Sequence, residues 1–172
     1  MTDQPIQIRR AQLKDLPTLA RFGLALAQLH ATFDEQRFVV PGDETTFSEY
    51  FAGELARDDV VLLLAQIDTK PVGYAFVRIE PASIEELREQ GAWLHDLYVV
   101  PGARTRGVGR LLVESAFDAA RDLGSPTLML GVSPHNASGR ALFERLGFRP
   151  TMIEMTAEIK NQLHAHLDNE ES

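Results

Sequence analysis

One short stretch, residues 104–109 with the sequence RTRGVG, constrains the fold of this chain more than any other. It follows an apolar segment at 93–100, predicted to be a strand, and it opens an amphipathic segment at about 107–123, predicted to be a helix. The start of a helix presents backbone N–H groups without intrahelical partners, together with a partial positive charge. Both properties favour phosphate binding, so the strand, loop and helix together predict a site for a diphosphate-bearing cofactor.

The residues of this loop fit that prediction. Gly107 and Gly109 lack the Cβ atom that would keep a pyrophosphate away from the backbone donors. Arg104 and Arg106 can add charge-assisted hydrogen bonds. The position between strand and helix carries the signal, because two glycines at this spacing occur about once by chance in a chain of this length. An ordinary surface loop is the alternative on this local evidence.

Two other nucleotide-binding patterns place glycines in a similar loop. A dinucleotide fold needs a further glycine three residues after the second and an acidic residue on the next strand. Here position 112 is leucine, and the segment at 127–132 contains no acidic residue. A Walker A loop needs Gly-Lys-Ser/Thr, which the chain lacks. The sequence therefore disfavours both patterns.

The composition is that of one soluble domain. The chain has 172 residues, of which 44% are hydrophobic and 24% are charged. We expect a single domain over 1–172, with its core at about 6–160 and a C-terminal tail at 161–172. No apolar run approaches the ~20 residues of a membrane span, and the first residues lack the character of a signal peptide. A cytoplasmic protein without a membrane partner is expected.

The charge and the absence of cysteine exclude several chemistries. With no cysteine, the chain has no disulfide framework, no thiolate metal site and no route through an acyl-cysteine. A net charge of −8 argues against a nucleic-acid partner. His164 and His166 are spaced too loosely near the end of the chain to suggest a metal site, so no metal is expected.

The remaining segments predict a mixed α/β order. The alternating residues 6–9 predict a short strand, and Asp15 can cap a helix that has Pro17 in its first turn. The aromatic-rich segment 31–57 is expected to be mostly helical. The later predictions are a hairpin of 60–67 and 72–79 around the turn 68–71, a connection at 80–91, a buried strand at 127–132, a helix at 136–146 ended by Gly147, and one or two final strands at 149–159.

Two motifs in the right order, about twenty-five residues apart, make the chain resemble the GCN5-related N-acetyltransferases, the GNAT superfamily. The pyrophosphate loop of that family has the pattern Arg/Gln-x-x-Gly-x-Gly/Ala, which Arg104, Gly107 and Gly109 match. The preceding strand, LYVVP at 97–101, and the last helix, NASGRALFERLGF at 136–148, are also similar to family patterns. The resemblance is specific over 93–148, whereas residues 6–79 agree only in the order of elements.

The resemblance implies an α/β fold of the GNAT type. Its mixed, mostly antiparallel central sheet has 6–7 strands, is flanked by about four helices, and is splayed between the fourth and fifth strands. The resemblance further implies that acetyl-CoA, or another acyl-CoA, binds where those strands splay apart. The pantetheine would run along the backbone of 97–99 like an added strand. A homodimer is a further alternative, since dimers are common in the superfamily.

The cofactor-binding residues implied by the resemblance come from the strand, the loop and the last helix. They are Leu97, Tyr98, Val99, Arg104, Thr105, Arg106, Gly107, Val108, Gly109, Arg110, Asn136, Arg140 and Phe143. The side chains of Leu97 and Val99 also suit a buried strand, so their backbone groups are expected to make the contacts.

The implied reaction is acyl transfer to an amine by direct attack in a ternary complex. The Val99 backbone N–H is the expected oxyanion donor, as in relatives. We predict His95 as the general base, because the pKa of histidine lies near the operating pH. The alternative is that His95 is a packed strand residue. By simple alternation Asp96 points to the opposite face, although a bulge would change this.

The general acid and the acceptor are open. Many relatives have tyrosine where this chain has Phe143, so Tyr98 or water would protonate the departing thiolate, or it would leave unassisted. We predict an N-acetyltransferase for a primary amine of a small molecule. The alternatives are a protein lysine or N-terminal acetyltransferase, and a non-catalytic acyl-CoA-binding regulatory module. The identity of the acceptor depends on 31–57 and 80–91, which match no pattern, and the acyl group can be acetyl or longer.

Overall fold

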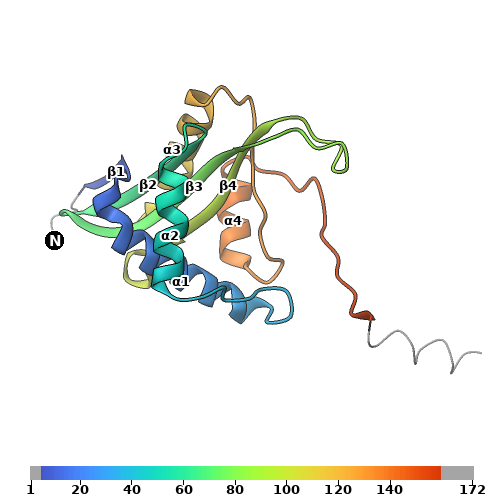
Figure 1. Ribbon diagram of the computed structural model, residues 1–172, viewed down its shortest axis with the longest axis horizontal. Helices are drawn as coiled ribbons and strands as arrows, with labels where there is room; N and C mark the ends of the chain where they lie inside the picture. Colours follow the sequence, from blue (N-terminus) through green and yellow to red (C-terminus); the bar gives the residue numbers. More distant parts are fainter. Residues whose placement is uncertain (1–4, 160–172) are drawn as a thin grey trace, which may run out of the picture.

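The computed structural model describes residues 5–159, which form a five-stranded sheet with helices on both faces (Figure 1). The predicted tail at 161–172, with His164 and His166, lies outside the described residues. The strands pair in chain order and are β1 Ile6–Arg10, β2 Val60–Ile67, β3 Lys70–Glu80, β4 Gly91–Val99 and β5 Leu128–Met129. The first four are antiparallel and β5 is parallel to β4, which confirms a mixed, mostly antiparallel sheet.

Four α-helices of residues 5–159 surround this sheet, in agreement with the prediction of about four. They are α1 Leu16–Phe33, α2 Glu44–Leu55, α3 Val108–Asp122 and α4 Ala137–Arg145. Short 3₁₀ turns at Leu13–Asp15 and Pro101–Ala103 precede α1 and the loop before α3. The predicted helical segment 31–57 thus comprises the end of α1, a loop and α2. Within the described part of the chain, no helix is both long and apolar enough to span a membrane.

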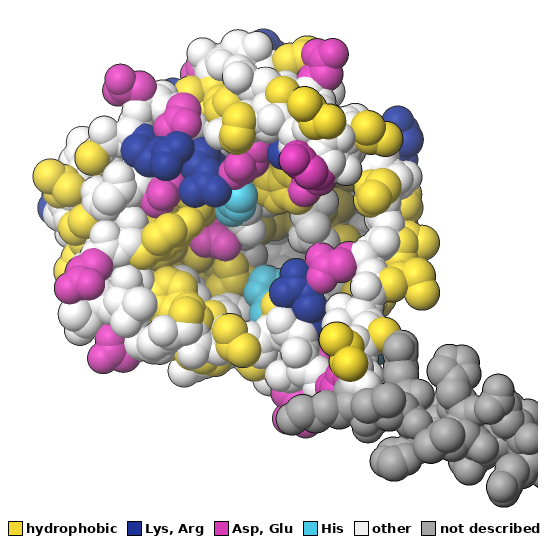
Figure 2. Space-filling view, turned by 45° about the vertical axis from the view of Figure 1, so that its right-hand side comes forward, with side chains coloured by type: hydrophobic (Ala, Val, Ile, Leu, Met, Phe, Trp, Pro, Cys, Tyr) yellow, Lys and Arg dark blue, Asp and Glu magenta, His cyan; other side chains and the backbone are white. Residues whose placement is uncertain are grey.

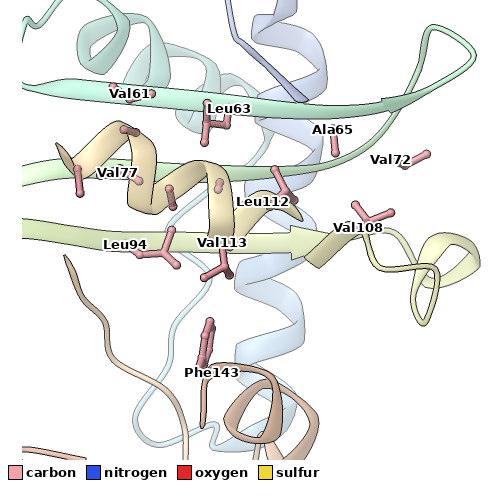
Figure 3. Close-up of a cluster of buried hydrophobic side chains, with 14 of the residues drawn as sticks. Val61, Leu63, Ala65, Val72, Val77, Leu94, Val108, Leu112, Val113 and Phe143 are labelled. Carbon is pink, nitrogen blue, oxygen red and sulfur yellow. The ribbon is translucent and has the colours of Figure 1, made fainter. Parts of the chain in front are cut away.

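The sheet separates two hydrophobic cores. On one face, Val108, Leu112 and Val113 of α3 are buried against β2, β3 and β4 (Figure 3). Their spacing is the helical stripe that the sequence predicts. On the opposite face, α1 and α2 cover the other side of the same strands, with Phe51 fully buried. The end of β4 is therefore fixed from both faces.

The start of α1 differs from the prediction in one detail. Asp15 occupies the N-cap position, but its side chain makes no cap hydrogen bond to α1. Instead its carboxylate accepts two hydrogen bonds from Arg9, at 2.7 and 2.8 Å, and one from the Gln12 N–H. The Arg9 hydrogen bonds are the main cause of the lowered pKa of Asp15. Asp15 therefore joins β1 to the 3₁₀ turn rather than capping the helix.

A bulge in β4 changes which residues share a face of the sheet. Phe76 lies opposite Asp96 and Val77 lies opposite Leu94, so His95 is the extra residue of β4. The His95 ring lies 5.1 Å from the Phe76 ring, and the Tyr74 hydroxyl donates to Asp96, so both residues face the α1 and α2 side. The expectation that Asp96 points away from His95 is wrong, because simple alternation fails at a bulge.

The described chain has five strands, not the 6–7 predicted. The predicted strand at 127–132 shortens to Leu128–Met129, which pair with Ala92 and Trp93 of β4. The predicted strands at 149–159 do not form in the described chain. A strand needs a hydrogen-bonded neighbour, and here the outer edge of β5 has none among residues 5–159.

Candidate active site

The predicted phosphate loop lies where β4 ends and α3 begins. After Val99 the chain makes the 3₁₀ turn at Pro101–Ala103 and reaches Gly107, the N-cap of α3. Gly107 has φ +85° and Thr105 has φ +67°, so the loop uses the left-handed region twice. No side chain caps the helix, and its first turn contains no acidic residue. The first N–H groups of α3 are therefore available to an anion.

A groove of about 1040 Å³ extends from this loop between β4 and α4. Most of the predicted cofactor-binding residues line it, namely Leu97, Tyr98, Val99, Arg104, Thr105, Gly107, Gly109, Arg110, Asn136 and Phe143. Residues from segments about forty positions apart in the chain thus meet at one surface. We call this surface the groove.

Three predicted cofactor-binding residues do not line the groove. Val108, the first residue of α3, is buried in the core, so its side chain serves packing. Arg106 lies beside a smaller hollow with Lys70, and the Arg140 guanidinium lies 3.9 Å from Glu144 on the outer side of α4. Neither arginine belongs to the groove in this structure.

Several residues of the groove also have a structural role. An added Cβ at Gly109 would lie 3.2 Å from Leu142, so this glycine lets α4 approach α3 closely. The Asn136 side chain accepts a hydrogen bond from the Gly139 N–H at 3.0 Å and caps α4. Phe143 is buried, with its ring 5.6 Å from Phe148. At Gly107, by contrast, an added Cβ would meet no atom within 4 Å. No neighbouring side chain fills this space, which is open to a ligand.

The backbone of β4 turns hydrogen-bonding groups of Val99 away from β3, toward the groove. The Val100 N–H donates to Val72 on β3, and Tyr98 is the partner of Tyr74. Because alternate residues of a strand point their N–H and C=O groups to opposite sides, those of Val99 point away from β3. The Arg104 side chain donates to the Val99 carbonyl at 3.1 Å, which agrees with this direction. β5 pairs with β4 only at Ala92 and Trp93, so it does not occupy this edge.

His95 is held by a carboxylate at the other end of β4. Its Nε2 atom lies 2.7 Å from Glu80 Oε1, at the end of β3. The Glu80 pKa is lowered: burial opposes this, but hydrogen bonds from Arg78 and His95 outweigh it. Because a carboxylate only accepts hydrogen bonds, Nε2 carries the proton in this pair, which leaves Nδ1 of the neutral ring as the proton acceptor. His95 does not line the groove itself.

Arg78 joins this histidine to a wider group of charges. Its guanidinium donates to Glu80 at 2.6 Å and to Glu54 of α2 at 3.3 Å. We call Glu54, Arg78, Glu80 and His95 the charged cluster. The pKa of His95 is lowered first by burial and then by the positive charge of Arg78, while Glu80 opposes the shift. The imidazole is therefore neutral at pH 7, as a general base must be.

Asp96 lies next to this cluster. Its carboxylate accepts a hydrogen bond of 2.8 Å from the hydroxyl of the fully buried Tyr74. Burial raises the Asp96 pKa to about 6, although the Tyr74 hydrogen bond lowers it. Burial also raises the pKa of Tyr74 well above its ordinary value, so Tyr74 stays protonated and donates. A carboxyl group whose pKa is raised to about 6 therefore faces the same side as His95.

One face of the molecule is hollowed. Figure 2 shows a recess in this face, and histidine, acidic, basic and apolar side chains surround it. Arg37 of the α1–α2 loop forms an ion pair with Glu154 of the C-terminal segment, which ties these two segments together. The recess contains charged groups of both signs.

Sequence reasoning missed several residues of the site. Leu29 and Phe33 line the groove, and their i, i+4 spacing at the end of α1 marked one helical face. His135, an exposed turn residue before α4, also lines the groove. Glu80 and Arg78 gave no sequence signal, because only the pairing of β3 with β4 brings them to His95. Among residues 5–159, no group of three or more potential metal ligands gathers.

A known family model matches most of this chain. Residues 26–148 match the model of the acetyltransferase (GNAT) family. The chain therefore belongs to this family and is an acyltransferase.

Sequence relatives and a solved structure agree with this assignment. The uncharacterized N-acetyltransferase YhfO of Bacillus subtilis is 29% identical over 143 residues, covering 83% of this chain and 89% of the relative. Aminoglycoside N(6')-acetyltransferase type 1 of Klebsiella aerogenes is 30% identical over 61% of this chain and 69% of its own length. Aminoglycoside N-acetyltransferase AAC(6')-Iy in complex with CoA has a TM-score of 0.71 at 18% identity, covering 90% of this chain and 95% of that one.

Proposed function

We propose that this protein is an acetyl-CoA-dependent N-acetyltransferase that acetylates a primary amine of a small molecule by direct attack in a ternary complex. The observation that carries the proposal is that three features needed for the reaction lie along β4 and directly after it. One strand leads from a histidine held by a carboxylate to a free backbone edge and then to an uncapped helix start. These are the three parts that acyl transfer from a CoA thioester needs.

The residues of the groove fit a CoA molecule. The open space at Gly107 and the free N–H groups of α3 suit the pyrophosphate, and Arg104 and Arg110 lie beside them. The free edge of β4 at Leu97 and Val99 suits the amide groups of pantetheine, in a strand-like pairing. The predicted splay between β4 and β5 is the space in which this arm would lie. A relative of the same fold is known in complex with CoA.

The chain's own residues supply the groups that move protons. The thioester of acetyl-CoA supplies the acetyl group, and the amine forms a bond to its carbonyl carbon as the carbon–sulfur bond breaks. Nδ1 of His95 accepts the amine proton, directly or through water, while Glu80 holds Nε2–H. The Val99 N–H, which points to the free edge of β4, donates to the developing oxyanion. Tyr98 or water returns a proton to the thiolate, since Phe143 has no proton to give.

The charges around His95 support an amine acceptor. Glu54, Glu80 and Asp96 lie on the same side as His95, and Arg78 balances only part of their charge. With a net charge of −8, the protein attracts cations in general. One relative is an aminoglycoside acetyltransferase, an enzyme for a small molecule with several amines. These features favour a small cationic acceptor over a protein substrate.

An acceptor screen tests the proposal. Purified protein is mixed with acetyl-CoA, and thiol release is followed with small polyamines and aminoglycosides, with lysine-containing peptides, and without an acceptor. We expect release with small amines, and mass spectrometry to find the acetylated product. Release with peptides alone would favour the protein acetyltransferase instead. Calorimetric binding of CoA without turnover of any amine would leave the non-catalytic binding module.

A further inference from the structure

The groove passes around the edge of β4 and reaches both faces of the sheet. Its phosphate end lies at the start of α3, whose buried side chains pack on one face. The ring of Tyr98, which also lines the groove, packs on the opposite face, 5.5 Å from the Phe22 ring of α1. A molecule that fills the groove therefore starts on the α3 face and ends on the α1 face, which is the face of His95.

The end of α1 forms the wall of the groove on this second face. Leu29 and Phe33 follow Phe22 by about two and three helical turns, and both line the groove. Figure 1 shows the end of α1 near α4, which lines the same groove. In the described chain α1 contributes only these two apolar side chains, whereas the charged lining residues come from the phosphate loop, α3 and α4. We call Leu29, Phe33 and the Tyr98 ring the apolar end of the groove.

The apolar end is held in place by the protein's own packing. The Phe33 ring lies 5.9 Å from the His30 ring, and His30 stacks on Phe38 at 5.0 Å. Burial lowers the pKa of His30, so this imidazole is neutral at pH 7 and adds no charge. Leu29 and Phe33 are nevertheless only partly buried. A preformed apolar wall of this kind gains free energy when a nonpolar group covers it.

We propose that the groove takes, besides acetyl, a longer saturated acyl group, whose carbons beyond the carbonyl pack against Leu29 and Phe33. This rests on the proposed function, because that function places the thioester at the edge of β4. The bond changes are those of acetyl transfer. The amine nitrogen bonds to the acyl carbonyl carbon, the carbon–sulfur bond breaks, His95 accepts the amine proton, and the CoA thiolate takes up a proton from Tyr98 or water.

An acyl chain suits this wall better than a cationic acceptor does. A cation finds its counter-charges at Glu54 and Glu80 of the charged cluster, and none among the side chains of the apolar end. Each methylene group that leaves water for an apolar surface should strengthen binding by about fourfold. Butyryl-CoA has two more methylene groups than acetyl-CoA, so it should bind about 15-fold more tightly.

Calorimetry with acetyl-CoA and butyryl-CoA tests the acyl site without any acceptor amine. Leu29→Trp fills the apolar end and should bring the ratio of the two affinities to about one. Leu29→Asn, which is similar in size but polar, should lower the same ratio even if Leu29→Trp fails to fold. Gln28→Trp is the matched control, because Gln28 is exposed and does not line the groove, and it should keep the wild-type ratio.

The outcomes separate the acyl site from the proposed function. Equal or weaker binding of butyryl-CoA by the wild type, or a ratio that neither Leu29 variant lowers, would overturn the acyl site, while acetyl transfer to an amine could still be observed. Tight binding of butyryl-CoA that both Leu29 variants reduce, with no acyl transfer to any amine, would support the acyl site and overturn the proposed function.

Discussion

The two ends of β4 contrast in how they are built. At the C-terminal end, the groove uses mainly backbone groups, which are the free edge at Val99 and the uncapped start of α3 at Gly107. At the bulged part of the strand, the charged cluster uses side chains from α2, β3 and β4, held together by ion pairs. The groove end requires only a strand, a loop and a helix that follow one another in the chain. The charged cluster forms only when three separate elements pack together.

This contrast bears on how each part tolerates change. A backbone site is disturbed chiefly by adding atoms, because no side chain can be removed from it. A cluster of charged side chains is disturbed by removing any one member, since its partner is left buried and unpaired. Changes at the two ends should therefore separate binding of the CoA substrate from the proton transfer.

The largest effect is expected from Gly107→Glu, which tests the backbone end. The added side chain would enter the open space at the α3 start, and its charge would repel the pyrophosphate. We expect CoA affinity measured by calorimetry to fall at least ~100-fold, or about 3 kcal/mol.

Gly124→Glu is the matched control for that change. Gly124 also has positive φ and open space around it, but it ends α3 away from the groove. The two variants should lose similar stability, and only Gly107→Glu should lose CoA binding. Equal CoA affinity in both variants would remove the pyrophosphate from the start of α3.

His95→Ala tests the charged end and should cost about 100-fold in kcat with little change in CoA affinity. The loss should be largest at lower pH, because there a smaller fraction of the acceptor amine is neutral unless a base removes its proton. The lowered pKa of His95, caused first by burial, keeps the wild-type base neutral there. A pH–rate profile of the variant that matches the wild type would exclude His95 as the base.

Glu80→Gln tests the same end of β4 through a different residue, because Glu80 forms the hydrogen bond to His95 Nε2. Glutamine keeps the shape but removes the charge that raises the His95 pKa. We expect kcat to fall about tenfold and the acid limb of the pH–rate profile to move to lower pH. Glu86→Gln, in the neighbouring loop where the exposed Glu86 pairs with Arg88, should change neither.

The smallest effect is expected from Asp96→Asn, which should increase the free energy of unfolding. Burial raises its pKa to about 6 in the folded state, so the folded protein holds the proton more tightly than the unfolded chain. This contribution is fully present at low pH and is lost as pH rises through about 4 to 6. Asp96→Asn removes the buried charge and keeps an acceptor for the Tyr74 hydroxyl.

We therefore expect the Asp96→Asn protein to be about 1 kcal/mol more stable than wild type at pH 7.5, with the difference vanishing near pH 4. Urea unfolding at the two pH values measures this. Equal stability at both would mean that the Asp96 carboxylate is not desolvated. A large loss of kcat would instead make Asp96 part of the proton transfer.

Much of the backbone end could be predicted from the sequence. The loop between β4 and α3 and the apolar stripe of α3 follow from local patterns, because glycine, helix periodicity and strand alternation act over a few residues. The structure confirms the hairpin of β2 and β3 and the helix at 108–122 in nearly the predicted bounds. It also brings ten of the thirteen predicted cofactor-binding residues to one groove.

The charged end could not be predicted in the same way. Alternation placed Asp96 on the wrong face, because a bulge depends on the register of two strands rather than on either one alone. The contact of His95 with Glu80 joins residues fifteen positions apart across that register. The predicted strands at 127–132 and 149–159 differ for a related reason, since strand formation requires a neighbour that the sequence of the segment does not contain.

The sequence by itself therefore determined the family, the loop that we predict to bind phosphate, and the helix that follows it. These depend on dihedral preferences and on periodic burial, which are properties of short segments. Only the tertiary structure decided which face carries Asp96, which carboxylate holds His95 and which segments lack a strand partner. These depend on hydrogen bonds and packing between distant segments, and such contacts exist only once the chain has folded.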